Sequence, residues 1–76
     1  MTKLSSRLGI PWAILKFSAP YLRSLRVRPM RRFFVIFERA DPYFVYFKWP
    51  GVFYSKEQAF LEVGKHLATV YAIKQS

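Results

Sequence analysis

The residues that offer chemistry in this sequence are arginines, and they gather in one short segment. Five arginines stand within ten residues that hold no acid, and these are Arg23, Arg26, Arg28, Arg31 and Arg32. Guanidinium groups neutralise phosphates and release the counterions bound there. Because like charges at this density repel one another unless an anion is near, the cluster predicts an anionic partner.

Aromatic side chains follow the arginines directly. If the strands expected after Arg32 leave one face uncovered, that face carries Phe34, Phe44 and Tyr46 beside Lys48. Flat side chains on an open sheet let bases stack, as in single-strand readers built on β-sheets. The glycine-flanked aromatic signature of those modules is absent. The leading hypothesis is a small, basic, non-enzymatic accessory or regulatory protein that binds DNA or RNA through the arginines, Lys48 and these rings.

Residues suited to catalysis or metal binding are scarce. The chain has one histidine, no cysteine and four carboxylates. Glu62 stands one helical turn before His66, and such a pair is more often a solvated helix contact than a catalytic dyad. The carboxylates are scattered, and the three glycines form no phosphate-cradling loop. We therefore expect no enzymatic activity, no catalytic residue, no metal site and no cofactor.

The positive charge is concentrated at the beginning of the chain. Residues 1–32 carry a net charge of +8 and residues 33–76 a net charge of +1, out of +9 in total. A field of this sign attracts phosphate, either in nucleic acid or in anionic lipid head groups.

A lipid surface is therefore the alternative partner. In this alternative, residues 8–25 anchor a peripheral membrane protein or a small subunit of a membrane complex. Trp12 and Tyr21 would lie at head-group depth, with Arg7 and Arg23 at either end of the apolar stretch. No charge-free stretch approaches the ~18 residues that a spanning helix needs, so we expect no transmembrane pass. The expected location is cytoplasmic, with membrane association under this alternative.

The size of the chain allows one domain with a marginal core. Of its 76 residues, 53% are hydrophobic and 20% are aromatic, which is more apolar material than so small an interior needs. We expect a partner, a second copy or lipid to cover part of it. A homodimer or a larger complex therefore stays open, as does a third hypothesis, a protein-binding inhibitor or structural subunit.

The elements that must position these residues form an α+β fold. Aromatic and β-branched residues over Arg32 to Tyr54 predict a three-stranded antiparallel sheet with strands at 32–39, 43–49 and 52–54. Asp41-Pro42 and Pro50-Gly51 supply the two turns.

Alternation along the strands predicts which face is buried. If Phe37 lies opposite Val45, one face is free of charge and is the expected core face, consisting of Phe33, Val35, Phe37, Val45, Phe47 and Trp49. The expected outward face consists of Arg32, Phe34, Ile36, Glu38, Phe44, Tyr46 and Lys48.

Helices are expected on both sides of the sheet segment in the sequence. Pro11-Trp12 and Pro20-Tyr21 predict two short helices at 11–18 and 20–27. Ser55 with Gln58 fits a capping box that opens a helix at 56–73, which should cover the uncharged face of the sheet. The expected organisation is a basic helical arm over residues 1–31 and a β-β-β-α domain over residues 32–76.

This layout resembles part of a known group of DNA-binding domains. The order of sheet, then Val52-Phe53-Tyr54-Ser55-Lys56-Glu57-Gln58-Ala59, then helix is similar to the end of the arm-binding domains of tyrosine recombinases and related plant transcription-factor domains. The resemblance implies a sheet laid in the major groove. It covers residues 32–76 and rests on element order and this helix-start pattern. The loop glycines and exposed polar strand residues of those domains are missing.

Overall fold

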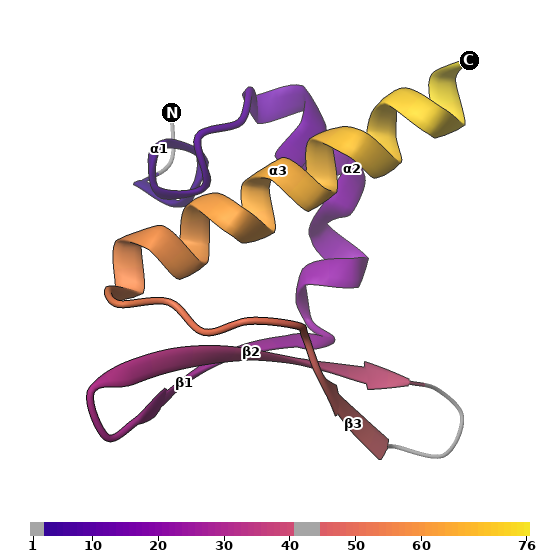
Figure 1. Ribbon diagram of the computed structural model, residues 1–76. Coiled ribbons are helices and arrows are strands. Elements are labelled where there is room, and N and C mark those ends of the chain that lie inside the picture. The colour runs from indigo at the N-terminus through magenta and orange to yellow at the C-terminus, as the bar shows by residue number, and fades with distance from the viewer. Residues whose placement is uncertain (1–2, 41–44) are drawn as a thin grey trace.

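A computed structural model describes residues 3–40 and 45–76 of the chain. It has three helices, α1 (Lys3–Leu8), α2 (Trp12–Leu22) and α3 (Lys56–Gln75). Strands β1 (Leu25–Met30), β2 (Phe33–Ala40) and β3 (Val45–Lys48) form one antiparallel sheet in the order β1-β2-β3. Figure 1 shows all three helices on one side of this sheet. The predicted α+β class, with a three-stranded sheet and a C-terminal helix, is confirmed.

One strand of the sheet comes from a segment predicted to be helical. The helix expected at 20–27 is wrong, because α2 continues through Pro20, ends at Leu22, and is followed by β1. Leucine, valine and arginine alternate from Leu25 to Arg28, which suits the period of two of a strand. The strand expected at 52–54 is reduced to a single bridge, in which Phe53 exchanges two backbone hydrogen bonds with Phe34.

The pairing register reverses the expected faces of β2. Phe37 lies opposite Lys48, and Val45 lies opposite Ala40. Because this register differs from the predicted one by three residues, an odd number, the side chains of β2 exchange faces relative to β3. Ile36 is 0% exposed and points to the helices, so the prediction that Phe33, Val35 and Phe37 form the core face of β2 was wrong.

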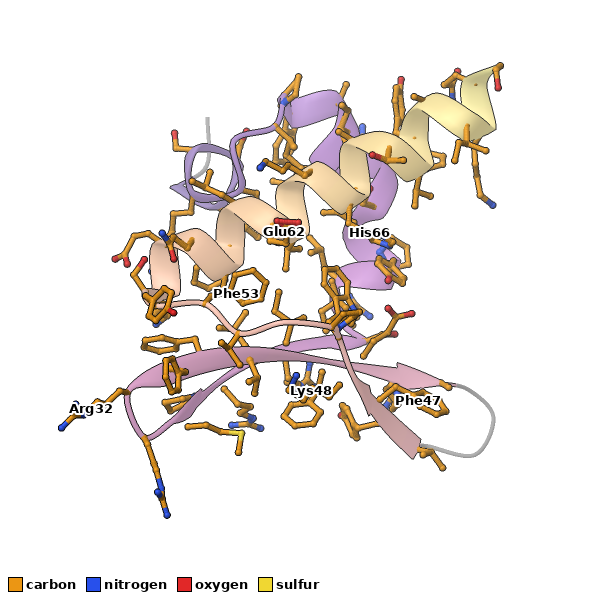
Figure 2. All side chains as sticks on the ribbon, viewed as in Figure 1. Arg32, Phe47, Lys48, Phe53, Glu62 and His66 are labelled. Carbon is orange, nitrogen blue, oxygen red and sulfur yellow. The ribbon has the colours of Figure 1, made fainter. Side chains whose placement is uncertain are left out.

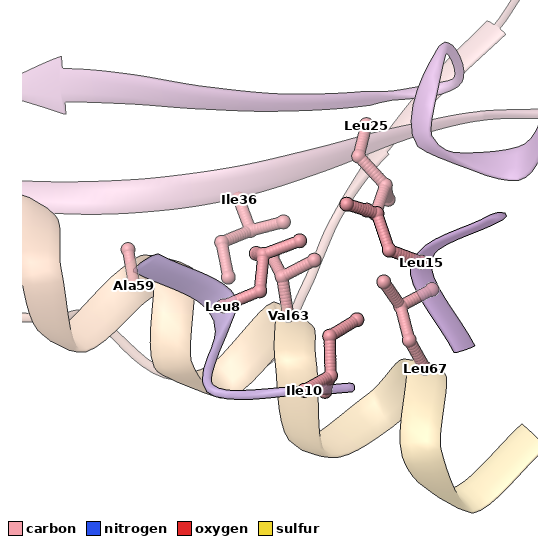
Figure 3. Close-up of a cluster of buried hydrophobic side chains, with 8 residues drawn as sticks. All are labelled: Leu8, Ile10, Leu15, Leu25, Ile36, Ala59, Val63 and Leu67. Atoms are coloured by element: carbon pink, nitrogen blue, oxygen red, sulfur yellow. The ribbon is translucent and has the colours of Figure 1, made fainter. Parts of the chain in front are cut away.

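The core lies between the helices and the inner side of the sheet. Figure 3 shows its buried cluster, which consists of Leu8, Ile10, Leu15, Leu25, Ile36, Ala59, Val63 and Leu67. Half of these side chains come from residues before β2. The boundary predicted after residue 31 falls inside the two-residue connection between β1 and β2.

Local contacts fix the position of α3. The Ser55 hydroxyl accepts a hydrogen bond from the backbone N–H of Gln58, as in a capping box. The Gln58 side chain accepts one from the N–H of Tyr54, the residue before the cap. The predicted cap is therefore present, with its return hydrogen bond shifted by one residue. Further along, Gly64 lies against the end of α1. A Cβ atom there would be 1.7 Å from the carbonyl oxygen of Leu8, so only glycine allows α1 and α3 to cross this closely.

Candidate nucleic-acid interface

The side of the sheet turned away from the helices is called the outer face here. Its members follow from the strand register, because residues that pair directly share a face. They are Arg26, Arg28 and Met30 of β1, Phe33, Val35, Phe37 and Arg39 of β2, and Tyr46 and Lys48 of β3. No carboxylate occurs among these residues, and none of the described helices covers them (Figure 1).

Cations occupy both flanking strands of the outer face. Arg26 and Arg28 on β1 and Lys48 on β3 are exposed. The Nη1 atom of Arg26 donates to the carbonyl oxygens of Arg23 and Leu25, each at 2.8 Å, which holds this guanidinium in place. Lys48 Nζ donates to the carbonyl oxygens at positions 49 and 51 and has a third N–H left to offer. Figure 2 shows Lys48 on the side of the sheet opposite to His66.

Two more arginines form the tip of the β1–β2 hairpin. Arg31 and Arg32 are the whole connection between β1 and β2, and both are exposed. Figure 2 shows the Arg32 side chain extending outward from this end of the sheet. Arg31 has a φ of 57°, the left-handed conformation in which a hairpin of this length favours glycine. The backbone is therefore strained at a position where the chain places a guanidinium.

Aromatic and apolar side chains fill the middle of the outer face. Phe33 is 37% exposed, Tyr46 is 43% exposed, and Met30 is also exposed, while Phe37 is half-buried. Val35 is only 1% exposed although no described helix lies over it. Since Val35 pairs with Arg28 and sits among longer side chains, the stems of its neighbours shield it.

The structure brings most of the predicted binding residues together. Tyr46 and Lys48 share the outer face with Arg26 and Arg28, while Arg31 and Arg32 lie at the adjoining hairpin tip. Arg23 is the exposed C-cap residue of α2, and one residue separates it from the start of β1.

One of the three predicted aromatic residues is not on this face. Phe34 packs against the core on the inner side of the sheet, and Phe44 lies outside the described residues. Met30, Phe33 and Phe37, which the structure places there, were missed. In Leu25–Arg28, arginine alternates with leucine and valine, which indicates that the arginines of this strand face outward. Because directly paired residues share a face, this signal could have shown which residues of the neighbouring strand face outward too.

The inner side of the sheet contains the only carboxylate of the described strands. Tyr21 Oη donates to Glu38 Oε1 at 2.6 Å, and Trp49 Nε1 donates to the same oxygen at 3.0 Å. His66 Nε2 lies 3.2 Å from Tyr21 Oη. Because the tyrosine proton is given to Glu38, this contact requires Nε2 of His66 to donate. The negative charge of Glu38 is thus held among helix-side donors, away from the outer face.

The same contacts affect the tyrosine. Burial, followed by the hydrogen bond and the charge of Glu38, raises the pKa of Tyr21 well above its ordinary value. The ring of His66 lies 4.9 Å from that of Trp49. The Tyr21–Glu38–Trp49–His66 cluster therefore joins α2, α3 and the sheet.

Within residues 3–40 and 45–76, no group of three potential metal-binding side chains comes together. No described helix has the length and apolar character to cross a membrane.

Comparison with protein-family models gave no match, and neither did comparison with curated proteins or with solved structures.

Proposed function

We propose that this protein binds nucleic acid without catalysing a reaction, and that the outer face and the hairpin tip make the phosphate contacts. The observation that carries the proposal is an uncovered sheet face that bears Arg26, Arg28 and Lys48 and no carboxylate among its described residues. Guanidinium groups bind phosphate through paired hydrogen bonds, and a field of one sign speeds the approach of a polyanion.

A salt titration of binding tests the phosphate contacts. Fluorescence anisotropy with a labelled oligonucleotide, between about 50 mM and about 200 mM salt, gives the slope of log K against log salt. We expect measurable binding and a negative slope. The double variant Arg26→Gln/Arg28→Gln keeps most of each side-chain stem on the outer face, beside Phe37 and Val35, but removes two charges. Its slope should be less steep by about 0.7 for each lost phosphate contact.

A matched variant separates the outer face from net charge. Lys16→Gln/Lys74→Gln removes the same charge from exposed positions of α2 and α3. It should keep at least half of the wild-type affinity. Equal weakening by both double variants would mean that net charge, and not this face, determines binding. No binding to DNA or RNA at low salt would end the proposal.

Several residues that a membrane anchor at residues 8–25 would use are buried or hydrogen-bonded within the fold. Leu8, Ile10 and Leu15 are buried in the core, and Tyr21 is engaged with Glu38. Trp12 and Phe17 remain exposed. Binding to anionic vesicles in place of nucleic acid would favour that alternative.

A further inference from the structure

The outer face has a regular arrangement of rings and cations across its strands. In one row, Phe37 of the central strand lies between Arg26 of β1 and Lys48 of β3. Directly paired residues are ~5 Å apart at their Cα atoms, so the ring has a cation on each side within reach of one nucleotide. A base stacked on this ring would have its phosphate next to a positive charge.

Two hollows open on this face, one at each end of the apolar middle. The first, of about 300 Å³, is lined by Arg26, Arg28, Phe37 and Tyr46. The second, of about 280 Å³, is lined by Met30, Arg31, Phe33, Val35, Lys48 and Val52. Each hollow combines aromatic and apolar walls with cations, which is the combination that a base and its phosphate require.

The distance between the rings bears on the form of nucleic acid. Phe33 and Phe37 are four residues apart on β2, a separation of ~13 Å at the rise of a strand. Neighbouring bases of a duplex strand are only ~3.4 Å apart, and both faces of each base are covered by its neighbours. Bases that reach both hollows must therefore be unstacked from one another, which a single strand allows.

The side chains of the central strand also fit base faces better than base edges. Reading a duplex in the major groove needs hydrogen-bonding side chains directed at the edges of the bases. The exposed middle of the outer face instead presents the rings of Phe33 and Phe37. Ring stacking does not depend on base identity, because every base has a π-face.

We propose that the outer face is a binding site for single-stranded nucleic acid, in which one base stacks in the hollow beside Phe37 and Tyr46 and another in the hollow beside Phe33. Arg26, Arg28 and Lys48 neutralise the phosphates. This inference rests on the proposed function and names its ligand class. Ribose and deoxyribose strands share the required chemistry.

The test compares a single strand with a duplex of the same length. Anisotropy is measured with strands of about 12 deoxyuridines and of about 12 uridines, and with a duplex of about 12 base pairs. We expect at least ~10-fold tighter binding of a single strand than of the duplex at the same salt concentration. The two single strands show whether the sugar matters. Duplex binding as tight as single-strand binding would overturn the inference but leave the proposed function standing, whereas no binding to any of the three ends both.

Substitution of the central ring tests stacking itself. Phe37→Leu should weaken single-strand binding by ~10-fold and change duplex binding by much less. A misfolded variant would lose single-strand binding and duplex binding together. The ratio of the single-strand affinity to the duplex affinity therefore separates a loss of stacking from a loss of folding. Phe47→Leu is the matched control, since Phe47 is 59% exposed but pairs with Glu38 and so lies on the inner side of the sheet. Equal loss in the two variants would contradict the assignment of the rings.

Discussion

Among single residues, Arg31 places a charge at the hairpin tip in a conformation that the backbone of an L-residue disfavours. A left-handed conformation costs an L-residue ~1 kcal/mol or more, and glycine is the usual solution in a two-residue hairpin. Arg31 nevertheless adopts it, with a φ of 57°. Strain of this kind is retained at functional sites, and the phosphate contact proposed for the hairpin tip gives it a reason.

Replacing Arg31 by glycine should separate stability from binding. In Arg31→Gly the released strain offsets the greater freedom of the unfolded chain, so the Tm should be no lower than that of the wild type. Binding should weaken, and the salt slope should become less steep by about 0.7. Thermal unfolding followed by circular dichroism and the anisotropy titration measure the two effects.

The control for this variant is Arg31→Lys, which keeps both the charge and the strain. It should bind with an affinity close to that of the wild type. Unchanged binding by Arg31→Gly would contradict the phosphate contact proposed for the hairpin tip. A clear loss of its stability would show that the arginine side chain supports the fold.

Among the helices and strands, the sequence correctly predicted the ends that are marked by a capping residue or a turn residue. The cap at Ser55 is present, and Gly51 has the positive φ, 88°, that the Pro50-Gly51 turn needs. The turn predicted at Asp41-Pro42 and the start of the strand predicted at 43 lie outside the described residues.

The faces of the sheet could not be predicted in the same way, because both faces of β2 are apolar. Phe33, Val35 and Phe37 alternate with Phe34, Ile36 and Glu38, so hydrophobicity alone gave no reliable choice. The assumed register put Arg32, Lys48 and the Glu38 carboxylate on one face, and their charge decided the prediction for β2 in the wrong direction. That carboxylate turns inward because Tyr21 and Trp49, distant in sequence, donate to it. Contacts of this kind are set by tertiary packing and leave no mark on a local pattern.

The link between α2 and the sheet should be visible in the pH dependence of stability. The pKa of Tyr21 is raised in the folded state, so its contribution to stability is complete below its ordinary pKa of 10.0 and is lost as the pH rises above that value. The variant Tyr21→Phe should be less stable at neutral pH by ~1 kcal/mol, the usual net value of one hydrogen bond. Its free energy of unfolding should then fall less steeply than that of the wild type above pH 10.

Urea unfolding at about pH 8 and about pH 10.5 measures both effects. Tyr54→Phe, at an exposed residue, is the reference substitution and should leave the stability at pH 8 unchanged. Parallel losses of stability by the wild type and Tyr21→Phe between these two values would show that the phenol contributes nothing to the alkaline limit.

In the whole molecule, a layer of helices covers one face of the sheet, and no described helix covers the other face (Figure 1). The described helices all lie on the inner side of the sheet (Figure 1). The core cluster lies between the helices and the sheet (Figure 3). The chain thereby leaves the outer face, with its arginines and rings, uncovered within the described residues. Large exposed apolar patches mark interaction sites, so the open aromatic face agrees with the ligand proposed above.

The most direct test of the central claim is to observe the arginine side chains by NMR while an oligonucleotide is added at low salt. The Nε–Hε resonances of Arg26 and Arg28 report on the outer face, and that of Arg7, whose guanidinium lies 4.7 Å from the Phe60 ring centre in the helical layer, is the internal reference. We predict that the resonances of Arg26 and Arg28 shift progressively and saturate, while that of Arg7 stays in place. Shifts confined to Arg7 and the helices, or none at any arginine, would contradict the account.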